Sequence, residues 1–122
     1  MKKIILICGL LASSFSFGAD WNIYSVSIDD SYISTYDKDS IKQVGVDSYK
    51  VWTNTTDQKQ QVNLVINNYI NCKNETVVQS DIYIYKDGKL LNSLLNQSDI
   101  VTPPPNSIGY GLISKICKNK AP

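Results

Sequence analysis

Two residue types that carry much of protein chemistry are missing from this chain of 122 residues. Histidine does not occur, and arginine does not occur either, so all 12 basic side chains are lysines, set against 11 acidic ones. Histidine is the usual general base near neutral pH and a common metal ligand. Nucleic-acid binding depends on clustered basic side chains that neutralise phosphates. We therefore predict a protein that is not an enzyme, uses no cofactor or metal, and binds no nucleic acid.

The chain also lacks an apolar run long enough to cross a membrane as a helix, which takes about 20 residues. Residues 4–11 form a shorter run, which follows the basic residues Lys2 and Lys3 and precedes a small and polar stretch. This order is typical of a secretory signal peptide. We predict a signal over residues 1–19, with cleavage before Ala19 or Asp20, and one mature domain over residues 20–122 without a transmembrane segment.

No lipidation box is evident in this leader. A lipidation signal requires small residues before its cysteine, whereas Cys8 follows Ile5, Leu6 and Ile7. We interpret Cys8 as one more apolar residue of the signal. The predicted location is the periplasm or the cell surface and outer membrane of a Gram-negative bacterium.

Removal of the signal leaves two cysteines, Cys72 and Cys117. In a small exported domain, thiols are normally paired, because the compartment is oxidising. A metal site is the sharper alternative, but two cysteines without histidine make half a zinc site. A catalytic cysteine has no histidine to activate it, and free thiols are the remaining alternative. We predict a disulfide between the two residues.

Alternation of apolar and polar residues predicts an antiparallel sheet of about five or six strands. The predicted strands cover residues 21–28, 32–36, 49–53, 62–72 and 78–85, with a return strand from residue 90. The clearest is 62–72, where one face carries Val62, Leu64, Ile66, Ile70 and Cys72, and the other carries Asn63, Asn67 and Asn71. Asn68 interrupts the apolar face, which indicates a bulge or a buried polar contact.

The next predicted strand ends in a hairpin signal. Val78, Ile82 and Ile84 are predicted to share one face of it, opposed by Gln79, Tyr83 and Tyr85. Asp87-Gly88 then predicts a tight turn, because glycine adopts positive φ at little cost.

Three prolines, residues 103–105, end the sheet, since proline cannot donate to a strand ladder. From Asn106 or Ser107 as N-cap, apolar residues recur at helical spacing, namely Ile108, Leu112, Ile113, Ile116 and Cys117, with Lys115 and Lys118 opposite them. The predicted fold class is α+β, mainly β: an antiparallel sheet with a C-terminal helix packed on one face and tethered by the disulfide.

Short motifs in this order resemble the surface-adhesin protein E family. They are Tyr36-Asp37-x-x-Ser40-Ile41, Val51-Trp52, a first cysteine at the end of a long strand, a proline followed by Ser107, and a final cysteine in the terminal helix. The chain departs from the family in having no lipidation box and in carrying Ile100 where an aromatic residue often precedes the proline. The resemblance implies an outer-membrane adhesin that binds host extracellular-matrix and serum proteins, vitronectin and laminin among them, and can form a homodimer.

Aromatic residues are the candidate binding groups, with 8 tyrosines and 2 tryptophans in the chain. Amphipathic aromatic side chains are favoured at protein interfaces, although they are also ordinary strand residues. We single out Trp52, Tyr83 and Tyr85, together with the turn residue Gly88, as a candidate protein-binding site. The predicted function is a surface adhesin for a host protein, and the alternative is a periplasmic interaction or inhibitor protein with a bacterial protein partner.

Overall fold

The computed structural model describes residues 20–120, so the predicted signal peptide lies outside the described residues. These residues form strands, one short 3-10 helix (η1) and one α-helix. In chain order they are β2 (Trp21–Val26), β3 (Tyr32–Asp37), η1 (Lys38–Ser40), β4 (Lys42–Gly45), β5 (Ser48–Asp57), β6 (Val62–Asn71), β7 (Thr76–Lys86), β8 (Lys89–Leu94), β9 (Ile100–Val101) and α1 (Ile108–Lys120).

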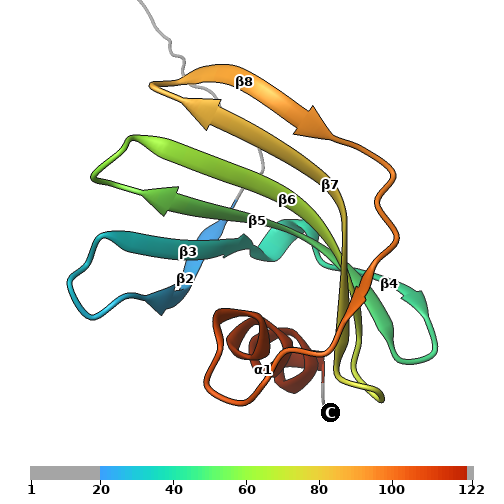
Figure 1. Cartoon of the computed structure of the whole chain (residues 1–122). Helices are drawn as coiled ribbons and strands as arrows, with labels where there is room; N and C mark the ends of the chain where they lie inside the picture. Colours follow the sequence, from blue (N-terminus) through green and yellow to red (C-terminus); the bar gives the residue numbers. More distant parts are fainter. Residues whose placement is uncertain (1–19, 121–122) are drawn as a thin grey trace, which may run out of the picture.

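The eight strands make one antiparallel sheet. Six of them follow the order β2-β3-β5-β6-β7-β8, while β4 pairs with β5 and β9 pairs with β7. The sheet arches over α1, which lies against its concave side (Figure 1). This arrangement confirms the predicted fold class of a mainly antiparallel β domain with a C-terminal helix.

Two short strands were not predicted. All four residues of β4 are exposed, so no alternation of buried and exposed positions marks it in the sequence. β9 has two residues, both exposed, and ends two residues before the first proline of the segment 103–105. The helix begins one residue after its predicted N-cap Ser107, whose Oγ accepts a hydrogen bond from the Tyr110 amide at 3.2 Å.

The predicted face of residues 62–72 is confirmed. Pairing between β5 and β6 continues without a shift from Ser48 opposite Asn71 to Asp57 opposite Val62. Ile70 is 1% exposed and belongs to the core. Alternating residues point to opposite sides of a strand, so Leu64 and Cys72 lie on the same side of the sheet as Ile70.

Asn68 makes a buried polar contact within that face. Its Nδ2 donates to Thr53 Oγ1 at 2.9 Å and to the Val51 carbonyl at 3.2 Å. The same nitrogen lies 3.1 Å from the Ile66 carbonyl. These bonds offset the cost of placing an amide inside the protein. Of the two readings that the sequence left open for Asn68, a bulge or a buried polar contact, the structure shows the buried polar contact.

The bulge lies in β7, beside Asn68 rather than at it. Asn67 pairs with Asp81 and Asn68 pairs with Gln79, which leaves Ser80 as the extra residue.

One extra residue moves the following side chains of a strand to the opposite face. The prediction that Val78 shares a face with Ile82 is therefore wrong. Val78 lies opposite Tyr69, on the side that carries Tyr83, whereas its neighbour Val77 is buried in the core.

The core lies between α1 and the concave side of the sheet. Leu112, Ile113 and Ile116 supply the buried face of the helix, as predicted. From the sheet, they meet Tyr36, Tyr49, Val51, Ile70 and Val77.

Ile108 does not join this face, although the sequence predicted that it would. Its side chain is 48% exposed. The first helical turn instead brings Gly109 against the proline segment, where a Cβ on Gly109 would meet Pro103 Cγ at 3.0 Å. That close approach fixes the rotation of the first turn and leaves Ile108 outside the core.

The disulfide between Cys72 and Cys117 is present, with the two Cα atoms 5.7 Å apart. It joins the residue that follows β6 to the third turn of α1 across 45 positions of sequence. The bond therefore ties the helix to the sheet, as predicted.

Candidate functional site

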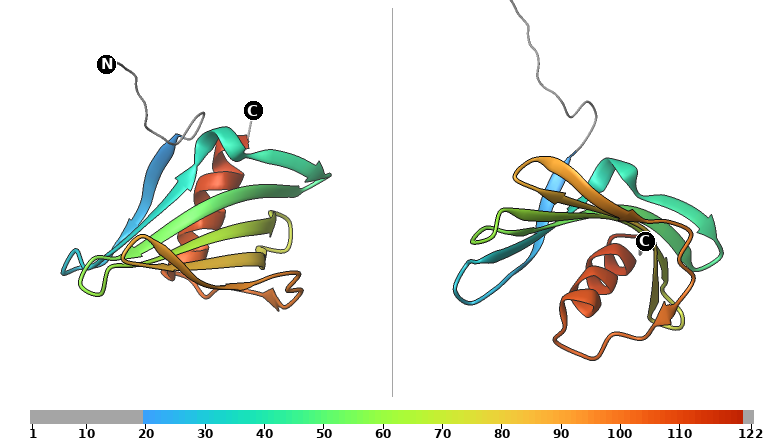
Figure 2. Two further views of the ribbon diagram at one scale, coloured as in Figure 1. Left: turned by 90° about the horizontal axis from the view of Figure 1, so that it is seen from above. Right: turned by 45° about the horizontal axis from the view of Figure 1, so that its top comes forward.

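The candidate site lies on the side of the sheet that faces away from α1. Figure 2 shows this side of β5, β6 and β7 in front of the helix, and no helix or strand within the described residues lies over it. We call the surface that these three strands present there the outer face. Its residues follow from the register: Ser48, Lys50, Trp52, Asn54 and Thr56 of β5, Asn63, Val65, Asn67, Tyr69 and Asn71 of β6, and Thr76, Val78, Asp81, Tyr83 and Tyr85 of β7.

Uncharged polar and aromatic groups make up most of the outer face. Within this set, Lys50 and Asp81 are the charged side chains, and they have opposite signs. Asn63 Nδ2 donates to Thr56 Oγ1 at 2.9 Å and to Asn54 Oδ1 at 3.3 Å. The outer face is therefore close to neutral and rich in amide and hydroxyl groups.

The structure brings Trp52 and Tyr83 together. Trp52 lies opposite Asn67, and Tyr83 lies opposite Val65, so the two aromatic side chains flank β6 from its two neighbouring strands. Their ring centroids are 6.2 Å apart, with an angle of 31° between the planes. Both side chains are half-buried, and together they form a tilted aromatic pair on the outer face.

Tyr85 and Gly88 continue from this pair toward the β7–β8 hairpin. Tyr85 is half-buried and lies opposite Asn63 on the same face. Gly88 has φ 82° and its neighbour Asp87 has φ 51°, which is the pair of positive φ values that a type I′ turn requires. Gly88 therefore contributes to the candidate site by shaping the turn.

Asn67 belongs to the site and was not predicted. It is 5% exposed, although the sequence placed it on the polar side of its strand. It lies directly between Trp52 and Asp81 in the register. Among the described residues, its Oδ1 is a buried side-chain atom without a hydrogen-bond partner. An asparagine in an alternating strand gives no signal of this burial, since the burial comes from side chains on the neighbouring strands.

A second polar cluster lies on the concave side. Ser34 and Thr55 share a hydrogen bond of 2.9 Å between their hydroxyl groups. Burial raises the pKa of Tyr24, and hydrogen bonds to Ser34, Thr55 and Thr53 counteract part of that effect. A phenol with a raised pKa stays protonated near neutral pH, so Tyr24 can donate a hydrogen bond but is a poor base.

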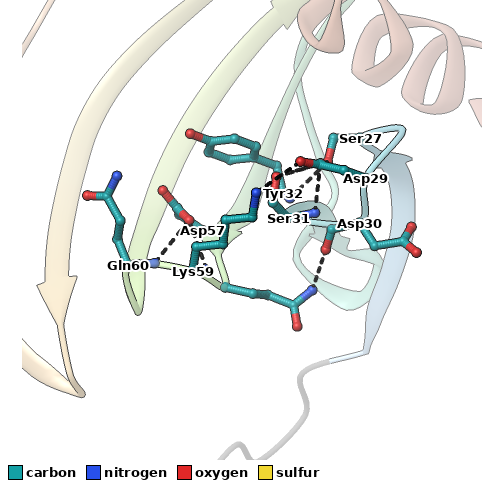
Figure 3. A network of polar contacts seen from close by, with 9 residues as sticks. Ser27, Asp29, Asp30, Ser31, Tyr32, Asp57, Lys59 and Gln60 are labelled. Carbon is teal, nitrogen blue, oxygen red and sulfur yellow. Dashed lines mark hydrogen bonds and ion pairs between the residues drawn. The ribbon is translucent and has the colours of Figure 1, made fainter.

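A third polar cluster joins the β2–β3 turn to the β5–β6 turn (Figure 3). Asp29 Oδ1 accepts hydrogen bonds from Ser31 Oγ at 2.6 Å, Ser27 Oγ at 2.9 Å and the Ser31 amide at 3.1 Å. Lys59 Nζ lies 3.2 Å from Asp29 Oδ2. The Ser31 hydroxyl is the main cause that lowers the pKa of Asp29, and the Ser31 amide, Ser27 and Lys59 add to it. The carboxylate is thus engaged in holding the two turns together.

Neither cluster resembles a metal centre. Within residues 20–120, no group of three or more cysteine or acidic side chains is arranged to hold a metal ion. The part of the chain that the structure describes also contains no helix with the length and apolar character needed to cross a membrane.

The chain was compared with models of known protein families. The family described as surface-adhesin protein E matches residues 21–118, which run from the start of β2 to near the end of α1. No curated protein and no solved structure matches the chain significantly.

Proposed function

Because the chain belongs to the surface-adhesin protein E family, we propose that residues 20–122 are an exported, non-enzymatic module that acts as a surface adhesin for host extracellular-matrix or serum proteins. The family match over residues 21–118 carries this proposal. In it, residues 1–19 are the signal peptide that directs export. The function is attachment, so the chemistry required is recognition of a large partner.

The outer face is the surface proposed to make the contact. It is uncovered by other described elements (Figure 2), and it carries Trp52, Tyr83 and Tyr85 on rigid strands. Tyrosine and tryptophan supply large contact areas at low cost in side-chain entropy, and they are enriched among residues that dominate binding energy. We expect these three residues to be the anchors.

Replacing Tyr83 or Tyr85 with alanine is expected to weaken binding to vitronectin or laminin. Loss of an anchor costs about 2 kcal/mol, which corresponds to roughly a 30-fold increase in Kd. Surface plasmon resonance with the mature protein measures this change. Tyr69→Ala is the matched control, because Tyr69 is an exposed tyrosine of the outer face whose partners across the strands are Lys50 and Val78 rather than the aromatic pair.

A circular-dichroism melt of each variant separates lost binding from lost folding. Binding that survives both changes would discard the outer-face site while leaving the adhesin function in place. Absence of binding by the wild type to any matrix or serum protein would discard the adhesin function itself.

A second function is favoured by one observation in the leader. Bulky residues precede Cys8, where a lipidation signal requires small ones, and attachment of an adhesin to the cell surface requires an anchor. A periplasmic interaction or inhibitor protein, docked on a bacterial partner, needs no such anchor. We expect protease added to intact cells to degrade the mature protein if it is an adhesin, and a periplasmic marker protein to stay intact as the control. Full protection of the protein in the same cells would favour the periplasmic function.

A further inference from the structure

We propose that the outer face binds a neutral glycan, presented by the glycoprotein to which the adhesin attaches. The contact centres on the Trp52–Tyr83 pair and on Asn67. This inference rests on the proposed function and names the part of the partner that the site recognises. Four features of the outer face support it.

The first feature is the aromatic pair. An aromatic ring carries negative charge density on its face, and one side of a pyranose ring presents C–H groups that are weakly positive. Sugars therefore stack on tryptophan and tyrosine rings. Trp52 and Tyr83, with centroids 6.2 Å apart and planes 31° from parallel, offer two adjacent rings for such stacking.

The second feature is the set of polar groups around the pair. Asn54 and Asn63 each carry an amide with both donors and acceptors, and Thr56 carries a hydroxyl. The three side chains are joined by hydrogen bonds of 2.9 and 3.3 Å, which hold them in fixed positions. Sugar hydroxyls both donate and accept hydrogen bonds, so amides beside an aromatic surface suit them well.

The third feature is the unpartnered oxygen of Asn67. A buried acceptor without a donor costs about 1 to 3 kcal/mol, and Asn67 Oδ1 is such an atom. Asn67 lies directly opposite Trp52 in the pairing of β5 with β6. A sugar hydroxyl that enters beside the Trp52 ring, with a small rotation of that ring, supplies the missing donor.

The fourth feature is charge. On the three strands of the outer face the charged side chains are Lys50 and Asp81, whose charges cancel. At the edge of this face, Lys42 of β4 lies opposite Lys50 and adds one positive charge. Sulfated or otherwise polyanionic glycans are bound through clusters of basic side chains. The outer face has no such cluster among the residues of β5, β6 and β7 that form it. The expected glycan is therefore neutral.

Tryptophan fluorescence gives a direct test, because the chain has 2 tryptophans. In the Trp21→Phe variant of the mature protein, Trp52 is the remaining reporter. Titration with neutral N-glycans released from laminin should give a saturable change in its emission, and titration with heparin oligosaccharides should give none. The matched Trp52→Phe variant, which reports from Trp21, should not respond to either glycan.

Asn67→Leu tests the unpartnered acceptor. Leucine has a similar size and removes the buried oxygen, so the variant should melt at the same temperature as the wild type or higher. Its affinity for the released glycans should nevertheless fall at least tenfold. If Asn67 had only a structural role, its replacement would not lower the affinity while leaving the melting temperature unchanged.

Binding to intact laminin and to laminin stripped of its N-glycans separates this inference from the proposed function. Loss of binding on glycan removal, together with the Trp52 response, supports the inference. Equal binding to both forms, or no saturable Trp52 response to neutral glycans, overturns it, and equal binding leaves the adhesin function standing.

Discussion

Replacement of Cys117 by serine is expected to lower the free energy of unfolding by about 2 to 5 kcal/mol, the usual effect of removing a disulfide from a small exported domain. The bond closes a long loop, because its cysteines are separated by 45 positions in the sequence, so its loss frees many conformations of the unfolded chain. The effect is large for this protein because α1 depends on packing: Gly109 and Gly111 each cost about 1 kcal/mol relative to alanine in a helix.

The helix should loosen before the sheet does. α1 is the last element of the chain and carries the bond near its C-terminal end, whereas β5, β6 and β7 hold each other through long ladders. Hydrogen exchange of the variant should therefore speed up in residues 108–118 more than in β6. Urea unfolding followed by circular dichroism measures the total loss, and reduced wild-type protein is the matched control. A variant as stable as the oxidised wild type would show that packing alone holds the helix.

The elements that the sequence predicted best have side chains that follow a simple period over many residues. β6 alternates over most of its length, with Asn68 as the interruption of its apolar face, and α1 places Leu112, Ile113 and Ile116 at helical spacing, so the core-facing sides of both elements could be assigned before the fold was known. The disulfide could be predicted from the count of two cysteines in an exported domain. Each of these inferences depends on local pattern or composition.

The features that escaped prediction depend on other strands. Ser80 is an ordinary strand residue, and its role as the extra residue of a bulge appears only when β6 and β7 are paired. The two-residue strand β9 exists because it finds an edge of β7 to pair with. Neither the bulge nor the short strand has a signature in its own segment of sequence, because both depend on pairing with another strand.

The residue types of the candidate site could be predicted from the sequence, but their grouping in space could not. Trp52, Tyr83 and Tyr85 could be selected by residue type, because amphipathic aromatics favour interfaces. That Trp52 and Tyr83 meet across β6 depends on the registers of two ladders, which the sequence does not display. The burial of Asn67 between them follows from those same registers. The fold thus adds to the sequence a specific grouping of residues, and that grouping is what the glycan inference uses.

Leu112→Asp is expected to be far more destabilising than Lys115→Asp, although both changes place an aspartate in the same helix. Leu112 is 3% exposed and belongs to the core, so the change removes a buried side chain and buries a carboxylate without a partner. Truncating a buried leucine alone costs about 2 to 5 kcal/mol, and an uncompensated buried charge adds to that cost. Lys115 is exposed, and exposed substitutions away from caps and buried contacts usually change stability by no more than about 0.5 kcal/mol.

Thermal melts of the two variants test the packing of the helix. If Leu112→Asp fails to fold, Leu112→Ala keeps the comparison measurable, because it removes the packing without adding a charge. It should still lose about 2 to 5 kcal/mol of stability, several times the loss in Lys115→Asp. The reverse order would mean that α1 presents its lysine side to the sheet, and then Cys117 could not meet Cys72 while Leu112, Ile113 and Ile116 fill the core. Equal and small losses would mean that the disulfide alone holds the helix. The ratio of the stability lost in Leu112→Ala to that lost in Cys117→Ser therefore measures how much core packing and the disulfide each contribute to the stability of α1.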